Sequence, residues 1–357
     1  MYPLNREKAY PQDEWCIAAY DKEVTDNILS RRFFDEQVVL YRTEDGMINA
    51  LSGLCAHRFM PLHLGSVEMG NLVCPYHGYT YDREGRCVHV PGSDRTSSRA
   101  RLRRFPVVEM GPFIWIWMGN PDRADTALLP DLAELGLSGS GEGFAVTYGK
   151  ILPMKARPAI LMDNLFDLSH IGFIHKETIP GGDALCAVPP VVEEWNGRYR
   201  VARHIAGFVA TADSFQGTAV KPIADRPVYA IVLTDYYSPT VVNSATWYYE
   251  LNDDGTAGAP IAQLNFVHGV TPETANSTHY SNVVTRNYNL IDESLDELLA
   301  WESDAVRIED VHALEMIETS APELSTKIEN STKSDEGALK VRRILAKLID
   351  AEVRLPA

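Results

Sequence analysis

Two cysteine–histidine pairs carry the most specific chemical signal in this sequence of 357 residues. Cys55 and His57 form a C-x-H pair, and Cys74 and His77 form a C-x-x-H pair after a gap of 16 residues. Each pair follows a short β-type segment, so we expect two turns that each present one thiol and one imidazole. Such a constellation predicts a metal site built by two loops.

The order of the ligands within each loop separates two kinds of metal site. Zinc also binds two cysteines and two histidines, but its usual spacing places like ligands together. One thiol and one imidazole per loop suits a Rieske [2Fe–2S] cluster, where one iron takes two thiolates and the other takes two imidazoles. The remaining cysteines and one nearby histidine lack ligand spacing, and we expect them to be ordinary side chains: Cys16, Cys87, Cys186 and His63.

A second constellation lies in the segment from Asp163 to His175. Asn164, Asp167 and His170 follow each other at intervals of three, so they share one face of a predicted helix. His175 lies five residues after His170, about 500° around a regular helix, and reaches that face only if the helix bends. Two imidazoles and a carboxylate with open positions form the ligand set of non-haem Fe(II) oxygenases. Two core histidines near a helix-terminal aspartate are the alternative.

Together the two constellations resemble a known family. Arg58 and Gly78 complete the motifs C-x-H-R and C-P-Y-H-G, and Tyr79 departs from them where many members have tryptophan. In this order, on a chain of this length, the motifs resemble the catalytic subunit of Rieske non-haem iron oxygenases. The resemblance covers nearly the whole chain. It is nearest to the branch of vanillate O-demethylase and dicamba monooxygenase.

The resemblance implies an α+β fold, with an N-terminal antiparallel β Rieske domain and a C-terminal helix-grip catalytic domain. It implies that the four residues of the first constellation bind the cluster, and that His170 and His175 bind iron. Asp167 is expected to bridge the two centres, and Asn164 to lie near the iron. The third iron ligand is expected far downstream, where the acids are Asp304, Glu309 and Asp310.

Further site residues come from the same resemblance. Trp301 followed by Asp310 matches the corresponding stretch of the dicamba-type enzymes, which favours Asp310 over the other two acids. His268 matches a histidine that faces the substrate pocket in that branch, although a buried core histidine is an equal alternative. Trp301 is expected to form an aromatic wall of the pocket, with a plain core residue as its alternative.

The elements that must position these residues change in type along the chain. Short β-type runs at 38–42, 47–52, 71–75 and 113–119, separated by turns, predict a small antiparallel β domain. A predicted helix covers 158–174, further strands cover 198–284, and helical periodicity returns at 292–318 and 337–353. We therefore expect a Rieske domain at 1–120 and a catalytic domain at 121–357.

Composition excludes several classes of function. A formal net charge of −16 disfavours binding to nucleic acid or to an anionic membrane surface. No apolar run is long enough to span a membrane, and no signal peptide is visible, so we expect a cytoplasmic protein. Five arginines form a basic cluster, either a solvated surface or a docking patch for an acidic electron donor: Arg95, Arg99, Arg101, Arg103 and Arg104.

The predicted function is that of a terminal oxygenase. The sequence has no dinucleotide fingerprint, so electrons from NAD(P)H must come through a separate reductase, with or without a ferredoxin. The branch implies a homotrimer that uses O2 to demethylate a methoxylated aromatic acid or phenol ether with release of formaldehyde. The alternatives are ring or angular hydroxylation of an aromatic acid or diaryl ether, and a Rieske electron-transfer protein without oxygenase activity.

Overall fold

The computed structural model describes residues 10–137, 143–179, 182–195, 198–212, 214–320 and 329–354. The chain divides into two compact units. The N-terminal unit contains Gln12–Leu129 together with the short segment Thr271–Ala275, and the C-terminal unit contains Pro130–Val270 and the chain from Asn276 onward. The division predicted after residue 120 stays a proposal.

Small antiparallel sheets build the described part of the N-terminal unit. One has the order β1 (Trp15–Tyr20), β10 (Phe113–Trp117), β9 (Val107–Met110). Another has the order β2 (Leu29–Phe33), β3 (Glu36–Arg42), β4 (Ile48–Ser52). The last has the order β5 (Ser66–Glu68), β6 (Asn71–Val73), β7 (Thr80–Tyr81), β8 (Cys87–His89). The predicted β runs therefore fall on β3, β4, β6 and β10.

Two hydrophobic clusters fill this unit, and they explain why its strands are so apolar. Every residue of β1 and β10 is buried, which is typical of strands covered on both faces. The second cluster contains both predicted cysteine ligands, Cys55 and Cys74, among leucines and Tyr81. The metal-binding loops are thus anchored in the core of the unit at their cysteines.

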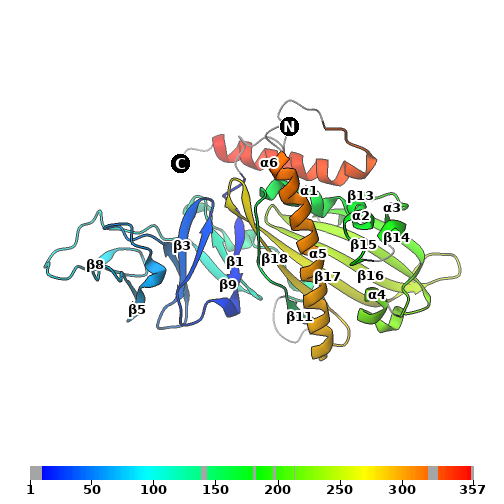
Figure 1. Cartoon of the computed structure of the whole chain (residues 1–357), viewed down its shortest axis with the longest axis horizontal. Helices are drawn as coiled ribbons and strands as arrows, with labels where there is room; N and C mark the ends of the chain where they lie inside the picture. Colours follow the sequence, from blue (N-terminus) through cyan, green and yellow to red (C-terminus); the bar gives the residue numbers. More distant parts are fainter. Residues whose placement is uncertain are drawn as a thin grey trace. The chain divides into compact units, whose positions relative to one another are not determined.

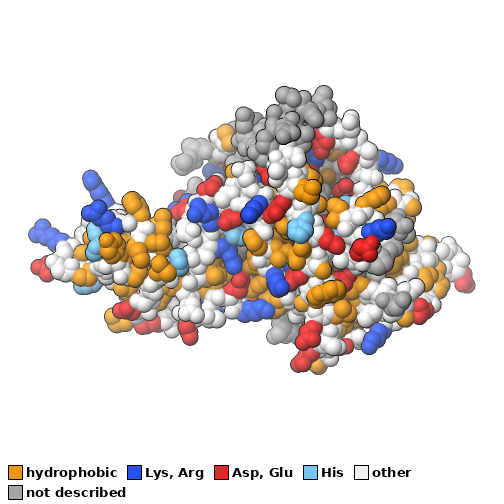
Figure 2. All heavy atoms as spheres, in the orientation of Figure 1, with side chains coloured by type: hydrophobic (Ala, Val, Ile, Leu, Met, Phe, Trp, Pro, Cys, Tyr) orange, Lys and Arg blue, Asp and Glu red, His pale blue; other side chains and the backbone are white. Residues whose placement is uncertain are grey.

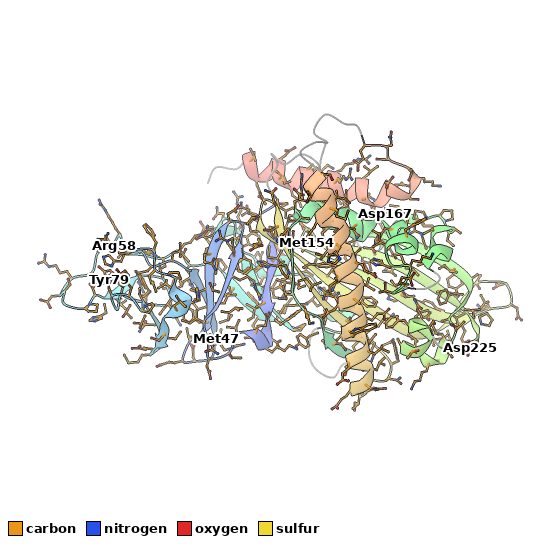
Figure 3. All side chains as sticks on the ribbon, in the orientation of Figure 1. Met47, Arg58, Tyr79, Met154, Asp167 and Asp225 are labelled. Carbon is orange, nitrogen blue, oxygen red and sulfur yellow. The ribbon has the colours of Figure 1, made fainter. Side chains whose placement is uncertain are left out.

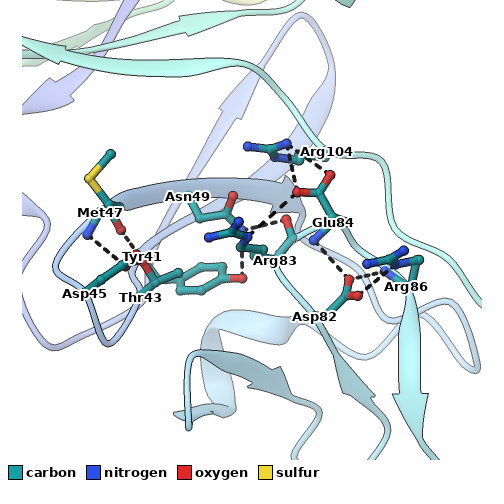
Figure 4. Close-up of polar contacts among 10 residues, drawn as sticks. All are labelled: Tyr41, Thr43, Asp45, Met47, Asn49, Asp82, Arg83, Glu84, Arg86 and Arg104. Atoms are coloured by element: carbon teal, nitrogen blue, oxygen red, sulfur yellow. Dashed lines mark hydrogen bonds and ion pairs between the residues drawn. The ribbon is translucent and has the colours of Figure 1, made fainter.

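Polar contacts join the sheet of β2–β4 to the β7–β8 turn (Figure 4). The Asn49 side-chain amide donates to the Tyr41 hydroxyl at 2.8 Å and to the Arg83 carbonyl at 3.1 Å. Arg104 donates to both carboxylate oxygens of Glu84 at 3.0 Å. These contacts hold the strands that carry the loops in register with the rest of the unit.

One large antiparallel sheet dominates the C-terminal unit (Figure 1). Its described strands follow the order β11 (Ala145–Tyr148), β18 (Ser277–Arg286), β17 (Ala257–Thr274), β16 (Val241–Leu251), β15 (Pro227–Ser238), β14 (Arg198–Val209), β13 (Val191–Trp195). The short strand β12 (Leu152–Met154) pairs with β18 beside β11. Together with the N-terminal β unit, this sheet and its helices confirm the predicted α+β class.

The long helix α5 (Glu293–Ser320) crosses this sheet, as Figure 1 shows. It packs on β11, β12 and β18, and it also contacts α1 (Pro158–Phe166), α2 (Ile171–Ile174) and α4 (Phe215–Ala219). The last helix, α6 (Glu336–Arg354), packs on α1, and α3 (Gly182–Cys186) packs on α2. No helix in the described residues is long and apolar enough to cross a membrane.

The structure corrects the predicted helix at 158–174. Helix α1 ends at Phe166, a single 3-10 turn follows at Leu168–His170, and α2 then begins. Asp167 has φ −109° and ψ 88°, which is not helical, and its carboxylate accepts the Ser169 N–H as a helix cap. The bend that lets His175 approach His170 therefore begins with a break at Asp167.

Candidate metal centres

The two cysteine–histidine loops of the N-terminal unit share one backbone geometry. In each loop the cysteine N–H donates to the carbonyl five residues on, and the N–H four residues on donates to the cysteine carbonyl, at 2.8 to 3.0 Å. That fourth residue has a positive φ in both loops, 57° at Phe59 and 65° at Gly78. A Cβ at Gly78 would lie 2.8 Å from Pro91, so space as well as backbone conformation requires glycine there. Cys55 and Cys74 thus occupy equivalent positions.

The side chains of these loops fit a cluster with two thiolate and two imidazole ligands. Cys55 and Cys74 are 1% and 2% exposed, and burial raises the pKa of the Cys74 thiol. A buried thiolate therefore needs a metal ion to balance its charge. The rings of His57 and His77 lie 4.8 Å apart between centroids. His57 Nδ1 is buried with no hydrogen-bond partner in the described chain, as expected of a nitrogen reserved for a metal.

Tyr79, the departure from the family motif, packs directly against one of these imidazoles. Its ring stacks on His57 with centroids 4.5 Å apart and an angle of 9° between the planes. Figure 3 labels Tyr79 beside Arg58 in this unit. The stacking fixes the plane of the His57 ring, so tyrosine orients a predicted ligand without being one. His77, in contrast, is exposed.

The second predicted ligand set comes together in the C-terminal unit. His170 ends the 3-10 turn, His175 caps the end of α2, and Asp310 lies in the middle of α5. One potential ligand atom from each lies within 4.8 Å of the others. Asp310 Oδ1 is 3.4 Å from His170 Nε2 and 3.1 Å from His175 Nε2. A facial set of two imidazoles and one carboxylate can hold Fe(II) and leave positions open.

The electrostatics of this set also suit a cation. Burial disfavours the charged form of Asp310, but hydrogen bonds from the two imidazoles hold the pKa of this carboxyl below its usual range. Burial alone lowers the pKa of His175, whereas Asp310 and Glu309 raise it above the usual value. The carboxylate is therefore ionised. In the described structure the two imidazoles stabilise its negative charge, a role that a bound metal ion would take.

Each imidazole is oriented by an oxygen on its Nδ1 side. His175 Nδ1 lies 2.8 Å from Glu309 Oε2, which also accepts the Thr178 hydroxyl at 2.6 Å. His170 Nδ1 contacts the main-chain carbonyl of Asp167. With a metal ion bound, each Nδ1–H would donate to its oxygen, and each Nε2 would offer its lone pair to the metal.

These two oxygens come from a main-chain group and from a distant side chain. The backbone break turns the Asp167 carbonyl, and not its carboxylate, to the His170 ring, and leaves the carboxylate on Ser169. Glu309, one of the three acids considered as the third iron ligand, instead contacts His175 at Nδ1, on the side of the ring away from Asp310. The sequence missed this role because the two residues lie 134 positions apart.

Asn164 and Asp304 occupy clearly different environments. The Asn164 amide donates to Asp310 Oδ1 at 2.7 Å, and its own Oδ1 is buried without a partner in the described residues. Asp304 Oδ1 accepts from Arg307 at 2.5 Å and from the Lys150 N–H at 2.9 Å. Asp304 therefore balances a buried guanidinium and is not part of the ligand group, whereas Asn164 touches one of the predicted ligands.

A cavity of about 170 Å³ opens onto the second ligand set. Its lining includes His170, His175 and Asp310, and it is otherwise mostly apolar, with side chains from the sheet and from α5. His268 lines it and is 6% exposed. Trp301 does not line it, because it is 65% exposed on the outer side of α5, so the predicted aromatic wall was wrong. Its neighbour Glu302 does line the cavity. Adjacent residues of a helix are rotated by about 100°, which is enough to turn Trp301 away from the cavity.

Hydrogen bonds fix the protonation of His268. Its Nδ1 lies 2.9 Å from the Tyr280 hydroxyl and 3.2 Å from the Asn282 amide nitrogen, while Ser303 donates to the Asn282 amide oxygen at 2.7 Å. Burial, with a smaller effect of Arg307, lowers the pKa of His268 to about 3. A neutral ring that accepts at Nδ1 carries its proton on Nε2, so His268 is a hydrogen-bond donor within the cavity.

Comparison with known families gives two matches along the chain. Residues 154–351 match the model described as vanillate O-demethylase oxygenase C-terminal domain. Residues 14–106 match the model of the Rieske [2Fe-2S] domain.

Curated relatives and solved structures agree with these matches. The oxygenase component of dicamba O-demethylase from Stenotrophomonas maltophilia is 31% identical over 355 residues, which covers 96% of this chain and 99% of that protein. A toluene-4-sulfonate monooxygenase system iron-sulfur subunit from Comamonas testosteroni is 29% identical, over 95% of this chain and 96% of that one. The crystal structure of dicamba monooxygenase bound to dicamba superposes with a TM-score of 0.83 at 28% identity, covering 96% and 99% of the two chains.

Proposed function

This chain belongs to the Rieske non-haem iron oxygenases with a vanillate O-demethylase-type C-terminal domain, and we propose that it removes the methyl group of an aryl methyl ether. One observation carries the proposal. His170, His175 and Asp310 converge at the edge of a mostly apolar cavity of about 170 Å³. An apolar cavity of about 150 Å³ is already large enough to bind benzene, so the site suits a small aromatic ring.

The proposed ligands follow the geometry of the two centres. Cys55, His57, Cys74 and His77 would hold the [2Fe–2S] cluster, and the other three residues would hold the mononuclear iron. When bound, these groups supply electrons and activate O2 for insertion into the substrate. The alternative of an electron-transfer protein is not favoured, since residues 154–351 match an oxygenase domain.

The chain's own residues orient the reactants. Glu309 and the Asp167 carbonyl hold the two imidazoles, and the Asn164 amide holds Asp310 Oδ1. The mostly apolar lining excludes water, which protects the reactive site from side reactions. His268 Nε2–H can donate to an ether or phenol oxygen of the substrate and so place the methyl group near the metal site.

The reaction balances as a monooxygenation. An aryl methyl ether, O2, two electrons and two protons give an aryl hemiacetal and water. The hemiacetal then loses formaldehyde and leaves a phenol. The electrons would come from NAD(P)H through a separate reductase, with or without a ferredoxin, because the curated relatives are components of multicomponent systems.

We also propose a head-to-tail homotrimer, in which His77 of one subunit meets Asp167 of the next. A closed ring of such heterologous contacts would join the two kinds of centre. Exposure of His77 and partial exposure of Asp167 support this contact. Asp167 would then connect a cluster ligand of one subunit, His77, with the predicted iron ligand that it contacts in its own subunit, His170.

A single-turnover assay tests the reaction without the unidentified reductase. The iron-loaded protein is reduced chemically under argon, mixed with an aryl methyl ether and then exposed to O2. We expect formaldehyde and the matching phenol in equal amounts. The panel contains methoxyphenols, methoxybenzoates and diaryl ethers. Ring-hydroxylated products that retain the methyl group, without formaldehyde, would instead establish the hydroxylation alternative.

A further inference from the structure

Glu302 is a buried acid that has no hydrogen-bond partner at Oε1 among the described residues. It lies on α5 eight residues before Asp310, is 6% exposed and lines the cavity. Its Oε1 is buried with no hydrogen-bond partner in the described residues. Glutamate is almost never buried without a partner, because an unpaired buried carboxyl group costs free energy. Its position in the cavity therefore points to a partner that arrives with a ligand.

The only arginine or lysine among the described lining residues, Arg307, is already used by other groups. Arg307 donates to the Tyr280 carbonyl at 3.0 Å and to the Lys150 carbonyl at 2.9 Å, and it pairs with Asp304 at 2.5 Å. Its Nε is buried without a partner in the described chain, but its charge is balanced by Asp304. Burial, together with the nearby charge of Glu309, raises the pKa of Glu302 to about 7. No arginine or lysine of the described lining is thus available to balance a further negative charge.

The lining therefore favours one class of polar substituent. An ionised carboxylate on the substrate would meet the Glu302 carboxyl group inside a low-dielectric cavity, where two like charges repel strongly. A hydroxyl or amino group would instead satisfy the unpaired Glu302 oxygen. The neutral His268 Nε2–H remains free to donate to an oxygen acceptor on the same ring.

We propose that Glu302 is a specificity-determining residue, which accepts a hydrogen bond from an O–H or N–H group of the aromatic substrate. This inference rests on the proposed function and narrows it. The preferred substrates are methoxyphenols or methoxyanilines, and methoxybenzoates are disfavoured. A hydrogen bond to a charged or strongly polarised carboxyl group is worth about a 10- to 100-fold change in affinity.

Anaerobic titration calorimetry of the iron-loaded protein tests the preference without turnover. The ligands are 2-methoxyphenol, 2-methoxyaniline, methoxybenzene and 2-methoxybenzoate. We expect at least one donor ligand to bind about 10- to 100-fold more tightly than methoxybenzene, with the benzoate weakest. The tighter of the two donors identifies O–H or N–H as the group recognised. Tightest binding by the benzoate, or equal binding of all four ligands, would overturn the proposal.

Two substitutions separate recognition from structure. Glu302→Leu should bind 2-methoxyphenol and methoxybenzene equally, and Glu302→Gln should retain part of the preference through its amide oxygen. Glu297→Gln, at an exposed site of the same helix, is the matched control and should leave all four affinities unchanged. An unchanged phenol-to-methoxybenzene ratio in Glu302→Leu would overturn the proposal.

Thermal unfolding supplies a readout independent of binding. Replacing an unsatisfied buried carboxyl by leucine should leave the Tm unchanged or raise it, because functional groups of this kind are held at a cost in stability. A marked fall in Tm would show that Glu302 stabilises the fold, and it would overturn the proposal that this side chain is kept to bind the substrate.

The formaldehyde assay separates this inference from the proposed function. If the affinity ratios change in Glu302→Leu but no substrate releases formaldehyde, demethylation fails and the recognition role stands. If formaldehyde is released from phenols and benzoates alike in both wild type and Glu302→Leu, demethylation stands and the recognition role fails.

Discussion

At the mononuclear centre the sequence motif identifies the metal-binding side chains but not the groups that orient them. The segment from Asn164 to His175 identifies two imidazoles, and a resemblance selects Asp310 from three downstream acids. The structure adds the oxygens that orient the rings, Glu309 and the Asp167 carbonyl. These partners could not be predicted, because one is distant in sequence and the other is a main-chain group revealed only by the local backbone.

Asp304 shows how a nearby acid can have a purely structural role. Asp304→Ala should lower the free energy of unfolding by about 3–5 kcal/mol, because it leaves the buried guanidinium of Arg307 unpaired. Urea unfolding measures the loss, and metal analysis should show an unchanged iron content in the protein that remains folded. Lys150→Ala is the control, since that exposed ammonium lies 3.9 Å from Asp304 and should matter little. Loss of iron without loss of stability would identify Asp304 as a ligand.

The neutral state of His268 predicts a dependence of stability on pH. Its pKa is about 3 in the folded protein and about 6.5 when unfolded, so the unfolded state binds more protons between these values. Stability is therefore fully present above pH 6.5 and falls as the pH drops toward 3. The contribution is about 1.4 kcal/mol per pH unit below 6.5.

Removing the titrating ring should remove that slope. Between pH 7.5 and pH 5.5 the free energy of unfolding of His268→Asn should fall by about 1.4 kcal/mol less than that of the wild type. Urea unfolding at both pH values measures this difference. Equal losses in the two proteins would show that folding does not lower the pKa of His268, and the neutral ring inferred from its surroundings would then be wrong.

At the scale of elements, long periodic segments were predicted well and local breaks were not. Helix α5 (Glu293–Ser320) and helix α6 (Glu336–Arg354) agree closely with the predicted 292–318 and 337–353, because many apolar positions define their buried faces. The end of α1 was missed, since the apolar pattern continues past Asp167. A cap is a single hydrogen bond, here from Ser169, and periodicity does not report it.

The proposed electron bridge, Asp167, lies at this break, and Figure 3 labels it in the C-terminal unit. Asparagine caps helices as well as aspartate does, so Asp167→Asn should preserve the turn, the cluster and most of the mononuclear iron. We expect it to lose nearly all steady-state activity, because a neutral amide does not replace the carboxylate as the proposed link to the cluster of a neighbouring subunit.

Re-oxidation of the Rieske absorbance in a single turnover measures this effect. The reduced Asp167→Asn protein should re-oxidise much more slowly than the wild type after O2 and substrate are added. Ser169→Ala removes the hydroxyl that donates to the Asp167 carboxylate but keeps that carboxylate and the Ser169 N–H that caps the turn, and it should re-oxidise at close to the wild-type rate. A variant at Asp167 that re-oxidises as fast as the wild type would exclude the bridging role.

At the scale of the whole molecule, a basic cluster stands out against a net charge of −16. Figure 2 shows basic side chains on the N-terminal unit. Arg103 and Arg104 are paired with Glu36 and Glu84, each at 3.0 Å, whereas Arg99 and Arg101 are exposed. The cluster predicted from the sequence is therefore only partly available to an acidic partner.

Reversing the two exposed charges tests the docking role. Arg99→Glu with Arg101→Glu should slow cluster reduction by the partner reductase about tenfold, because steering by opposite charge raises association rates. Salt should slow the wild type and have little effect on the double variant, since the Debye length falls to about 10 Å at 0.1 M. Arg32→Glu, at an exposed arginine of β2 in the same unit, is a control. Equal rates and equal salt dependence would leave the cluster as a solvated surface.

Iron stoichiometry tests the central claim, that two separate sets of residues in one chain hold two different iron centres. The wild type should contain about three iron atoms per chain, two in the cluster and one at the mononuclear site. Asp310→Ala should contain about two and keep the Rieske absorbance, because only the mononuclear set is broken. Cys74→Ala should contain about one and lose that absorbance. A wild type with a single zinc and no Rieske absorbance, or an Asp310→Ala protein with its full iron content, would contradict the account.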